Sequence, residues 1–425
     1  MKKLLLLIFA ASLLSPIASA APKAVAVKKL DIVASSVNAE GLVATGKTLV
    51  TYSNTGSTNS NIELTGLDVA GVQQWVRTID SGVDEIATVA TVDAAGKAVI
   101  PGFVDSHNHL IFARDRAAEF AARMKGEAYS AGGIATTVAA TREASDDDLL
   151  SNATRLVHEG LHSGTTTVEI KSGYGLTVKD EVRSLHIARQ LTDETTFLGA
   201  HVVPSEYQGK ADEYVELICE QMITQVKPYA KWIDVFCDKG AFTTEQARKI
   251  LLAGKAAGLL PRLHANQLAQ GDGIALGVEV GAASVDHISH FNNDDIELLK
   301  KSKTVATFLP AAEFSTRSNY PDARRMIEAG VTVALASDCN PGSSYTTNMS
   351  FVIALAVREM FFTPEQALWS ATKGGALALQ RDDVGHLSVG SKADFVILKE
   401  SSYIHLAYRP GVNLIDEVWQ HGKRI

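Results

Sequence analysis

The chain of 425 residues contains only three cysteines, Cys219, Cys237 and Cys339. So few thiols exclude a disulfide-stabilised scaffold and a zinc site built from four cysteines. An excess of basic residues is also missing, because Asp and Glu number 48 against 40 Lys and Arg, and the formal net charge is −8. We therefore do not expect nucleic acid or an anionic membrane surface to be the main partner.

Long apolar runs are absent except at the start of the chain, so we expect no membrane span beyond that point. Residues 1–20 read MKKLLLLIFAASLLSPIASA, with two lysines, an apolar stretch and a final Ala-Ser-Ala. This order is typical of a secretory signal peptide, which predicts an exported or periplasmic protein. An uncleaved anchor or a buried helix is the alternative.

Residues 21–97 lack both histidine and cysteine and are rich in Val, Thr, Ser, Asn and Gly. Short runs at 47–52 and 62–67, separated by a turn-forming stretch at 54–60, predict β-strands. Residues 67–80 are similar to one blade of a secreted β-propeller, but no second copy follows. We therefore interpret 21–97 as a β-rich N-terminal segment of atypical origin. Its expected role is packing or spacing, and it contains no metal-ligand or acid/base constellation.

A different rhythm begins after residue 97, where apolar runs alternate with amphipathic stretches such as 180–191, 244–257 and 294–301. The predicted strands are 99–106, 165–171, 195–203, 232–237, 261–266, 284–290, 304–309 and 331–337. Apolar strands separated by helices indicate an α/β fold with a parallel sheet covered on both faces. Eight units in about 250 residues are typical of a (β/α)8 TIM-type barrel. A doubly wound sheet is the alternative, but its glycine-rich phosphate loop is missing.

The predicted domains are a signal peptide at 1–20, the β-rich segment at 21–97, a barrel at 98–380 and C-terminal strands at 381–425. Short β-runs at 395–398 and 413–419 predict a small β-sandwich-like domain. Residues 23–97 are a further source of strands for this small domain.

Polar residues follow several of the predicted strands. His107 and His109 close the first strand, and residues two apart in an extended chain face the same side. Four further candidates stand at other strand ends: His201, His264, His287 and Asp338. Because active sites of barrels form at the carboxyl ends of the strands, we expect these side chains to converge.

Three imidazoles and one carboxylate suit zinc or iron. Such an ion makes a bound water acidic and polarises a carbonyl oxygen, which predicts hydrolysis of an amide-like bond. Asp338 is the candidate acceptor for the proton of the water, and His287 the candidate group that orients the water or stabilises the oxyanion. Cys339 is not needed as a nucleophile in this scheme.

Six ordered blocks carry a family resemblance: DRAAEFAAR, EIKSGYGL, FLGAHVVP, LHANQL, PAAEFSTR and SDCNPGSS. With PGFVDSHNHL, they resemble the amidohydrolase superfamily, and within it the imidazolonepropionases, over residues 97–422. Residues 1–96 do not match that family.

The resemblance implies hydrolysis of the ring amide of 4-imidazolone-5-propanoate to N-formimidoyl-L-glutamate in histidine degradation. It implies one Zn²⁺ or Fe²⁺/Fe³⁺ ion per chain and four metal ligands: His107, His109, His264 and Asp338. It implies seven substrate-binding residues: Arg116, Tyr174, His201, Gln267, Asn340, Gly342 and Ser343. Arg116 would hold the propanoate, because a guanidinium forks onto a carboxylate. The resemblance also implies a homodimer and a cytoplasmic location, the latter against the export signal.

Several alternatives stay open. Some family members carry an acid where this chain has Gln267, so a general-base role at this position is not supported. Arg116 could instead form a surface ion pair with Asp115 or Glu119. Lys171 could be a carbamylated lysine bridging two metals, although we favour a structural role. His158 and His162, four apart, could form a second metal pair, although a solvated helix face is favoured.

Two other functions are considered. One is a related cyclic-amide hydrolase or amino-heterocycle deaminase on the same barrel; the other is an exported, non-enzymatic β-rich binding protein with an inactive barrel. The N-terminal segment is either a natural fusion or a gene chimera joined near residues 93–97. In a chimera, the C-terminal strands would lack partners and leave an open edge.

Overall fold

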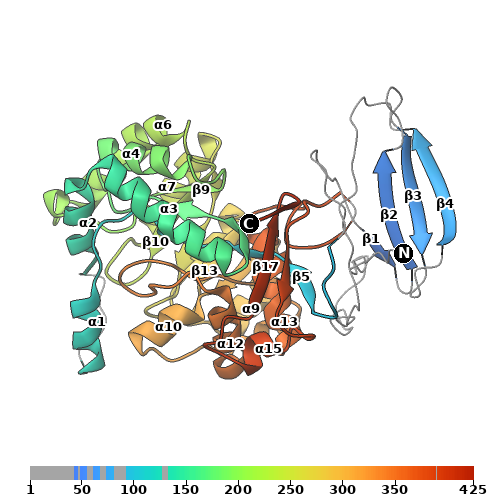
Figure 1. The fold of residues 1–425 in the computed structure, drawn as a ribbon. Coiled ribbons are helices and arrows are strands. Elements are labelled where there is room, and N and C mark those ends of the chain that lie inside the picture. Colours follow the sequence, from blue (N-terminus) through green and yellow to red (C-terminus); the bar gives the residue numbers. More distant parts are fainter. Residues whose placement is uncertain are drawn as a thin grey trace.

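The computed structural model describes residues 92–126, 133–388 and 390–425, together with four strands nearer the N-terminus. These strands are β1 (Val43–Thr45), β2 (Thr48–Asn54), β3 (Asn61–Leu67) and β4 (Gln73–Asp80). They form one antiparallel sheet in the order β1-β2-β3-β4, which Figure 1 draws in blue beside the rest of the molecule. The β-strands expected at 47–52 and 62–67 are thus present, whereas the expected signal peptide at 1–20 lies outside the described residues.

A curled parallel sheet forms the centre of the chain and confirms the predicted α/β barrel-type fold. Its strands are β6 (Phe103–Asp105), β7 (Thr165–Val168), β8 (Ile170–Lys171), β9 (Thr195–Ala200), β10 (Trp232–Cys237), β11 (Leu260–Pro261), β12 (Leu263–Ala265), β13 (Ser284–His287), β14 (Val305–Phe308) and β15 (Val333–Leu335). β6 pairs with β7, and the order continues from β8 through β9, β10, β12, β13 and β14 to β15. A parallel bridge between Asn108 and Cys339 joins the first strand to the last.

The strand predicted at 99–106 is wrong as a single element. It divides at Gly102 into β5 (Val99–Pro101), which is antiparallel to β16, and β6, which enters the barrel. The chain can turn here because residue 102 has no side chain: a Cβ atom would lie 2.1 Å from Thr166 Oγ1. Other predicted strands are shorter in the structure, and two of them are interrupted, at Glu169 and at Arg262.

The small C-terminal sheet has the order β18-β17-β16-β5. It contains β16 (Phe395–Leu398), β17 (Ile415–Gln420) and β18 (Lys423–Arg424). The expectation that residues 23–97 supply its strands is wrong for β1 to β4, which pair only with one another. β16 is paired on both sides, with β17 and β5, so this C-terminal strand has its partners within the described residues.

Helices cover the outside of the barrel. They are α1 (Ala117–Met124), α2 (Ile134–Glu143), α3 (Asp146–His162), α4 (Val178–Ala188), α5 (Ala211–Leu217), α6 (Ile223–Val226), α7 (Thr244–Ala256), α8 (Gly273–Val280), α9 (Asn293–Lys300), α10 (Pro310–Thr316), α11 (Arg324–Ala329), α12 (Met349–Glu359), α13 (Pro364–Trp369), α14 (Gly375–Ala378) and α15 (His405–Tyr408). Several start at a capping side chain; Thr243 and Asn292 form capping boxes at α7 and α9.

Burial explains why the sheet sits at the centre. Every residue of β9 and β10 is buried, as expected for parallel strands covered on both faces.

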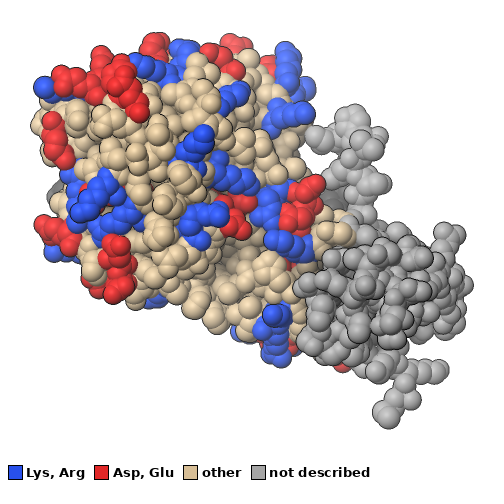
Figure 2. Space-filling view, turned by 90° about the horizontal axis from the view of Figure 1, so that it is seen from above, with Lys and Arg blue, Asp and Glu red and all other residues tan. Residues whose placement is uncertain are grey.

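On the surface, acidic and basic side chains are interspersed on the face shown in Figure 2. Among the helices of the described residues, none has the length and apolar character needed to cross a membrane. Among the buried polar side chains, His107, His109, His264 and Asp338 lie at the carboxyl ends of barrel strands.

Candidate metal and substrate site

Three imidazoles and one carboxylate meet at the carboxyl end of the barrel. His109 Nε2 lies 3.3 Å from His107 Nε2 and 3.3 Å from His264 Nε2. Asp338 Oδ1 lies 3.6 Å from His107 Nε2 and 3.5 Å from His109 Nε2. All four residues are buried. His264 lies in β12, whereas His107 and His109 follow β6 and Asp338 follows β15, so the four residues come from distant parts of the sequence.

These spacings fit a metal ion. Ligand atoms at 2.0–2.1 Å from a tetrahedral ion are about 3.3–3.4 Å from each other. The Nδ1 atoms of His107 and His264 face carboxylates, Asp286 Oδ2 at 2.8 Å and Asp234 Oδ1 at 3.0 Å. With Nδ1 protonated as the donor, the Nε2 atoms present lone pairs to one another, an arrangement that a cation between them would stabilise. The cluster is therefore consistent with a metal site.

Burial favours the neutral form of His107 and His109, as metal binding requires. It lowers the pKa of His107 well below the usual value, and the nearby charge of Lys171 acts in the same direction. Burial and the neighbouring His201 likewise lower the pKa of His109. Burial raises the pKa of Asp338 well above its usual value.

A buried ionic network lies under the histidines. Lys171 Nζ lies 2.9 Å from Asp234 Oδ2 and 3.1 Å from Glu169 Oε1. Arg262 Nη2 donates to Asp286 Oδ2 at 3.1 Å. All five side chains are fully buried. Because its ammonium is engaged by two carboxylates, Lys171 fits the structural role favoured above and not that of a bridging metal ligand.

His287 lies beside the cluster. Its ring centroid is 5.5 Å from that of His107 and 5.3 Å from that of His264. A ring nitrogen of His287 lies within 4.8 Å of those of both residues, so the side chain can act on a molecule held there. The backbone of His287 has φ 74° and that of Asp338 φ 54°. Such left-handed conformations cost energy in non-glycine residues and are concentrated at functional sites.

Two aromatic side chains line the neighbouring wall. The His201 ring stacks on the His109 ring at 5.2 Å, and its Nδ1 is 2.9 Å from the carbonyl oxygen of Gly173. The Tyr174 ring centroid lies 5.2 Å from that of His201. Burial, followed by the charge of His264, lowers the pKa of His201 to about 3. A neutral imidazole and a phenol ring suit contact with a flat heterocycle.

Arg116 is not the surface residue that the alternative considered. Its side chain is 5% exposed, although it does form the ion pair with Glu119 that the alternative named. Its positive charge is near enough to contribute to the lowered pKa of His201. A Cβ atom on Gly342 would lie 2.2 Å from Arg116 Nη1. The structure thus places Arg116 against Gly342, one of the predicted substrate residues, with its charge acting on His201, another.

The loop after β15 holds Asp338 in place. Asn340 Nδ2 donates to the Asp338 carbonyl oxygen at 2.7 Å and to Ser343 Oγ at 2.8 Å, and its Oδ1 accepts from the amides of Gly342 and Ser343. Ser343 Oγ lies 3.1 Å from Asp338 Oδ2, which directs Oδ1 towards the histidines. Asn340 and Ser343 therefore organise this loop.

Gln267 lies in the loop after β12 and is partly buried. Its backbone amide donates to Asp238 Oδ2 at 2.6 Å, and that of Leu268 to the same oxygen at 2.9 Å. Glu313, after β14, is buried and bonds Ser289 Oγ at 2.5 Å. Burial raises the pKa of Glu313 to about 7.

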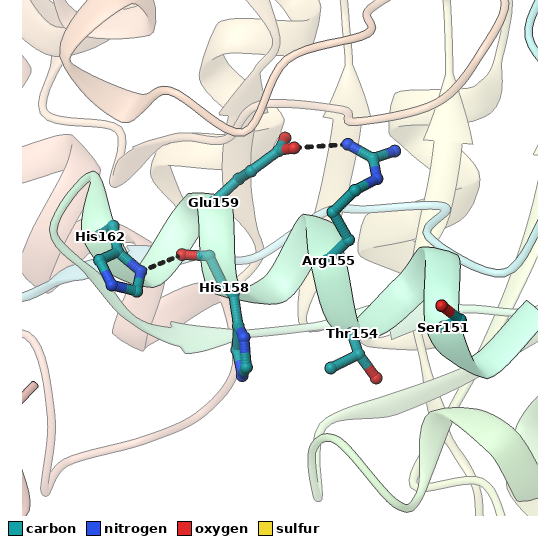
Figure 3. Close-up of a pocket in the computed structure, with 6 residues that line it drawn as sticks. All are labelled: Ser151, Thr154, Arg155, His158, Glu159 and His162. Carbon is teal, nitrogen blue, oxygen red and sulfur yellow. Dashed lines mark hydrogen bonds and ion pairs between the residues drawn. The ribbon is translucent and has the colours of Figure 1, made fainter.

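The second histidine pair is separate from this site. His158 and His162 lie in a surface pocket whose lining comes entirely from α3 (Figure 3). His162 Nδ1 is 2.8 Å from the carbonyl oxygen of His158, and Arg155 pairs with Glu159 beside them. Within the described residues, no cluster of potential metal ligands includes either histidine. These observations fit a solvated helix face.

Sequence reasoning gave no role in the site to several charged residues that contact it, lie in the ionic network under it or, like Glu313, act on the charge of Asp338. They are Glu119, Glu169, Asp234, Arg262, Asp286 and Glu313. A signal was present for three of them, because Asp234, Arg262 and Asp286 interrupt apolar strand segments. Charged residues are almost never fully buried unless they are paired, so such interruptions indicate a buried ionic network. The sequence does not indicate which charges pair.

Comparison with known proteins gives close relatives. A sequence profile described as the amidohydrolase family matches residues 98–424. An imidazolonepropionase of Mycolicibacterium smegmatis is 63% identical over 332 residues, which are 78% of this chain and 84% of that protein. An imidazolonepropionase of Streptomyces avermitilis is 59% identical over 339 residues, covering 80% of this chain and 82% of that protein.

Solved structures share the fold at low identity. A 5-methylcytosine deaminase from Klebsiella pneumoniae has a TM-score of 0.64 at 15% identity, covering 91% of this chain and 97% of that one. A zinc-complexed atrazine chlorohydrolase mutant from Arthrobacter aurescens has a TM-score of 0.60 at 15% identity, covering 82% of this chain and 91% of that one. These likenesses concern the curled parallel sheet and its small companion sheet.

Proposed function

The chain belongs to the amidohydrolase family, and on that premise we propose that it is an imidazolonepropionase. It hydrolyses imidazolone propanoate in histidine degradation. The observation that carries this function is the convergence of His107, His109, His264 and Asp338 in a chain 63% identical to a known imidazolonepropionase. The non-enzymatic alternative has no comparable support.

His107, His109, His264 and Asp338 are the proposed metal ligands, and Zn²⁺ or Fe²⁺/Fe³⁺ suits this donor set. A bound ion of this kind supplies a Lewis acid that makes water nucleophilic near neutral pH and polarises a carbonyl group. Asp234 and Asp286 fix the protonated Nδ1 atoms of two ligands and so keep the Nε2 atoms directed inwards.

The chain's own residues handle the proton and the charge. The attacking water gives its hydroxyl to the ring carbonyl carbon, and the carbon–nitrogen bond of the ring amide breaks. Asp338 accepts the proton of the water and returns it to the departing ring nitrogen. His287, close to two ligand rings, donates to the oxygen on which negative charge develops. The product is N-formimidoyl-L-glutamate.

The remaining residues hold the substrate. Arg116 binds the propanoate through its guanidinium, and Tyr174 and His201 lie along the imidazolone ring. Gln267 and the loop carrying Asn340, Gly342 and Ser343 complete the proposed pocket. The side chain of Asn340 already forms hydrogen bonds within the loop, so its proposed role is mainly to shape the wall of the pocket.

The test is turnover by purified protein. We expect loss of imidazolone absorbance with formation of N-formimidoyl-L-glutamate, and no turnover by Asp338→Ala. A folded wild-type protein that retains metal but leaves 4-imidazolone-5-propanoate intact would reject the function. Guanine and 5-methylcytosine, assayed for ammonia release, test the deaminase alternative in the same experiment.

Three further points belong to the same proposal. Metal analysis distinguishes zinc from iron, and sedimentation tests the homodimer. The leader-like residues 1–20 support export, and fractionation of expressing cells tests this against the cytoplasmic location. For the proposed division into 21–97, 98–380 and 381–425, the start of the family match at residue 98 supports the first boundary, whereas β5, just after that boundary, pairs with β16 of the small sheet.

A further inference from the structure

We propose that Glu119 is a positioning residue that holds Arg116 ready for the substrate carboxylate and thereby sets the preference for a propanoate-bearing ring. This inference rests on the proposed function, because it concerns how the same site selects its substrate. It adds a residue outside the predicted site, located on the first turn of α1.

The first observation is the way in which Glu119 binds Arg116. Glu119 Oε2 accepts from Arg116 Nε at 2.7 Å, and Oε1 accepts from Nη2 at 2.6 Å. A carboxylate on two neighbouring nitrogens fixes both the position and the plane of a guanidinium. The Nε–Nη2 edge is therefore occupied from within the chain, and Nη1 has no hydrogen-bond acceptor among the described residues. The free nitrogen is the one available to a ligand.

The second observation is the close fit around the guanidinium. A Cβ atom would lie 1.7 Å from Arg116 Nη2 if carried by Gly133, and 2.2 Å from Nη1 if carried by Gly342. The guanidinium thus occupies the space that side chains at these two glycines would need. Nη1 faces the loop that carries Asp338, and the Arg116 charge reaches His201. Arg116 is held at the wall of the site and cannot swing freely into solvent.

The third observation is a second arginine on the same carboxylate. Arg123 Nη1 donates to Glu119 Oε1 at 2.8 Å, and Arg123 Nη2 donates to the Gly342 carbonyl oxygen at 2.6 Å. Both arginine side chains are buried, at 5% and 3% exposed. Without Glu119, two buried guanidiniums would repel each other and Arg116 would lose its orientation.

The test compares the kinetics of Glu119→Gln and wild type on two substrates, one with the propanoate group and one without it. We expect KM for 4-imidazolone-5-propanoate to rise roughly tenfold or more, with kcat within about twofold, because a lost charge-assisted pair is worth about one factor of ten or more. For the unsubstituted imidazolone, kcat/KM should stay unchanged. A merely structural role would affect both substrates alike.

A binding experiment on the metal-loaded protein makes the test independent of turnover. Calorimetry with imidazole-4-propanoate and with 4-methylimidazole separates the carboxylate from the ring. Glu119→Gln should weaken only the first. If wild type fails to hydrolyse the imidazolone but shows this selective effect, the proposed function fails and the positioning role stands.

Two further variants complete the design. Glu159→Gln is the matched control, since Glu159 forms an exposed pair with Arg155 four residues earlier on α3; it should change neither ligand. Gly342→Ala should push Arg116 Nη1 aside and reproduce the propanoate-selective loss. Unchanged or tighter binding of imidazole-4-propanoate by folded Glu119→Gln would overturn the inference, as would an equal loss for both ligands.

Discussion

Replacing Asp286 by alanine tests whether the ionic network under the histidines serves stability, metal binding or both. Asp286 Oδ2 is 2.8 Å from His107 Nδ1 and 3.1 Å from Arg262 Nη2. Neither Asp286 nor Arg262 has measurable side-chain exposure. Arg262 pairs with Asp286, and its Nε and Nη1 have no hydrogen-bond partner among the described residues. Truncation at Asp286 would leave the buried Arg262 guanidinium without a hydrogen-bonded carboxylate, and only the attraction of the more distant Glu169 and Asp234 would remain.

The expected loss is large. Removing one partner of a buried ion pair typically lowers the free energy of unfolding by ~3–5 kcal/mol. The surface pair of Lys97 and Asp416, 36% and 31% exposed, provides the matched control. Asp416→Ala should cost less than about 1 kcal/mol, because exposed pairs are screened by solvent.

A double variant separates the two roles. In Asp286→Ala/Arg262→Met the stranded cation is gone, so about half or more of the lost stability should return. His107 Nδ1, however, still lacks its acceptor, and loss of such support typically weakens metal binding by roughly 10–100-fold. In the double variant, the free energy of unfolding should therefore recover while the metal affinity stays low.

Urea unfolding of the metal-free proteins measures the first effect, and chelator competition measures the second. A single variant within about 1 kcal/mol of wild type would refute the buried-charge argument. A double variant that binds metal as tightly as wild type would refute the orienting role of Asp286.

Three further outcomes are expected. Folded Glu313 has a pKa of about 7 against an ordinary 4.5, so it retains a proton that the unfolded chain releases, and stability falls as pH rises through that window. Glu313→Gln should remove up to about 3 kcal/mol of this loss between pH 5 and pH 8, as followed by urea unfolding. Chelation of the metal should abolish turnover and lower the melting temperature, and added zinc or iron should restore both. Gly102→Ala should destabilise by about 1–3 kcal/mol, because its Cβ would meet Thr166, whereas Gly271→Ala, with its nearest atom at 3.6 Å, should not.

The sequence predicts the elements whose pattern is local. Residues 232–237, a continuous apolar run, form β10 with the predicted bounds. The strand predicted at 99–106 differs, because its division at Gly102 depends on contact with Thr166, which is distant in sequence. Hydrophobic runs indicate that a segment is buried, but they do not indicate which of two sheets it joins.

The residues of the site likewise fall into those that the sequence predicts and those that it does not. Strand-end positions indicate six candidates, because the topology brings strand ends together. The family resemblance then implies four of them as metal ligands: His107, His109, His264 and Asp338. Glu119 could not be chosen, since a glutamate three residues after an arginine on a helix is ordinarily a solvated pair. Only burial of both arginines distinguishes it.

The position of the site in the barrel links its chemistry to folding. The Asp338 amide donates to the His107 carbonyl oxygen at 3.1 Å, and the His109 amide donates to the Cys339 carbonyl oxygen at 3.0 Å. The chain segments that carry three of the proposed ligands are thus the first and last of the barrel, joined where the sheet closes. Ser337 Oγ also donates to Asp105 Oδ2 at 2.6 Å across the same seam, over a separation of 232 residues. Closure of the barrel therefore brings three of the four proposed ligands together, and an ion held by both segments would stabilise a contact between parts of the chain that are more than 200 residues apart.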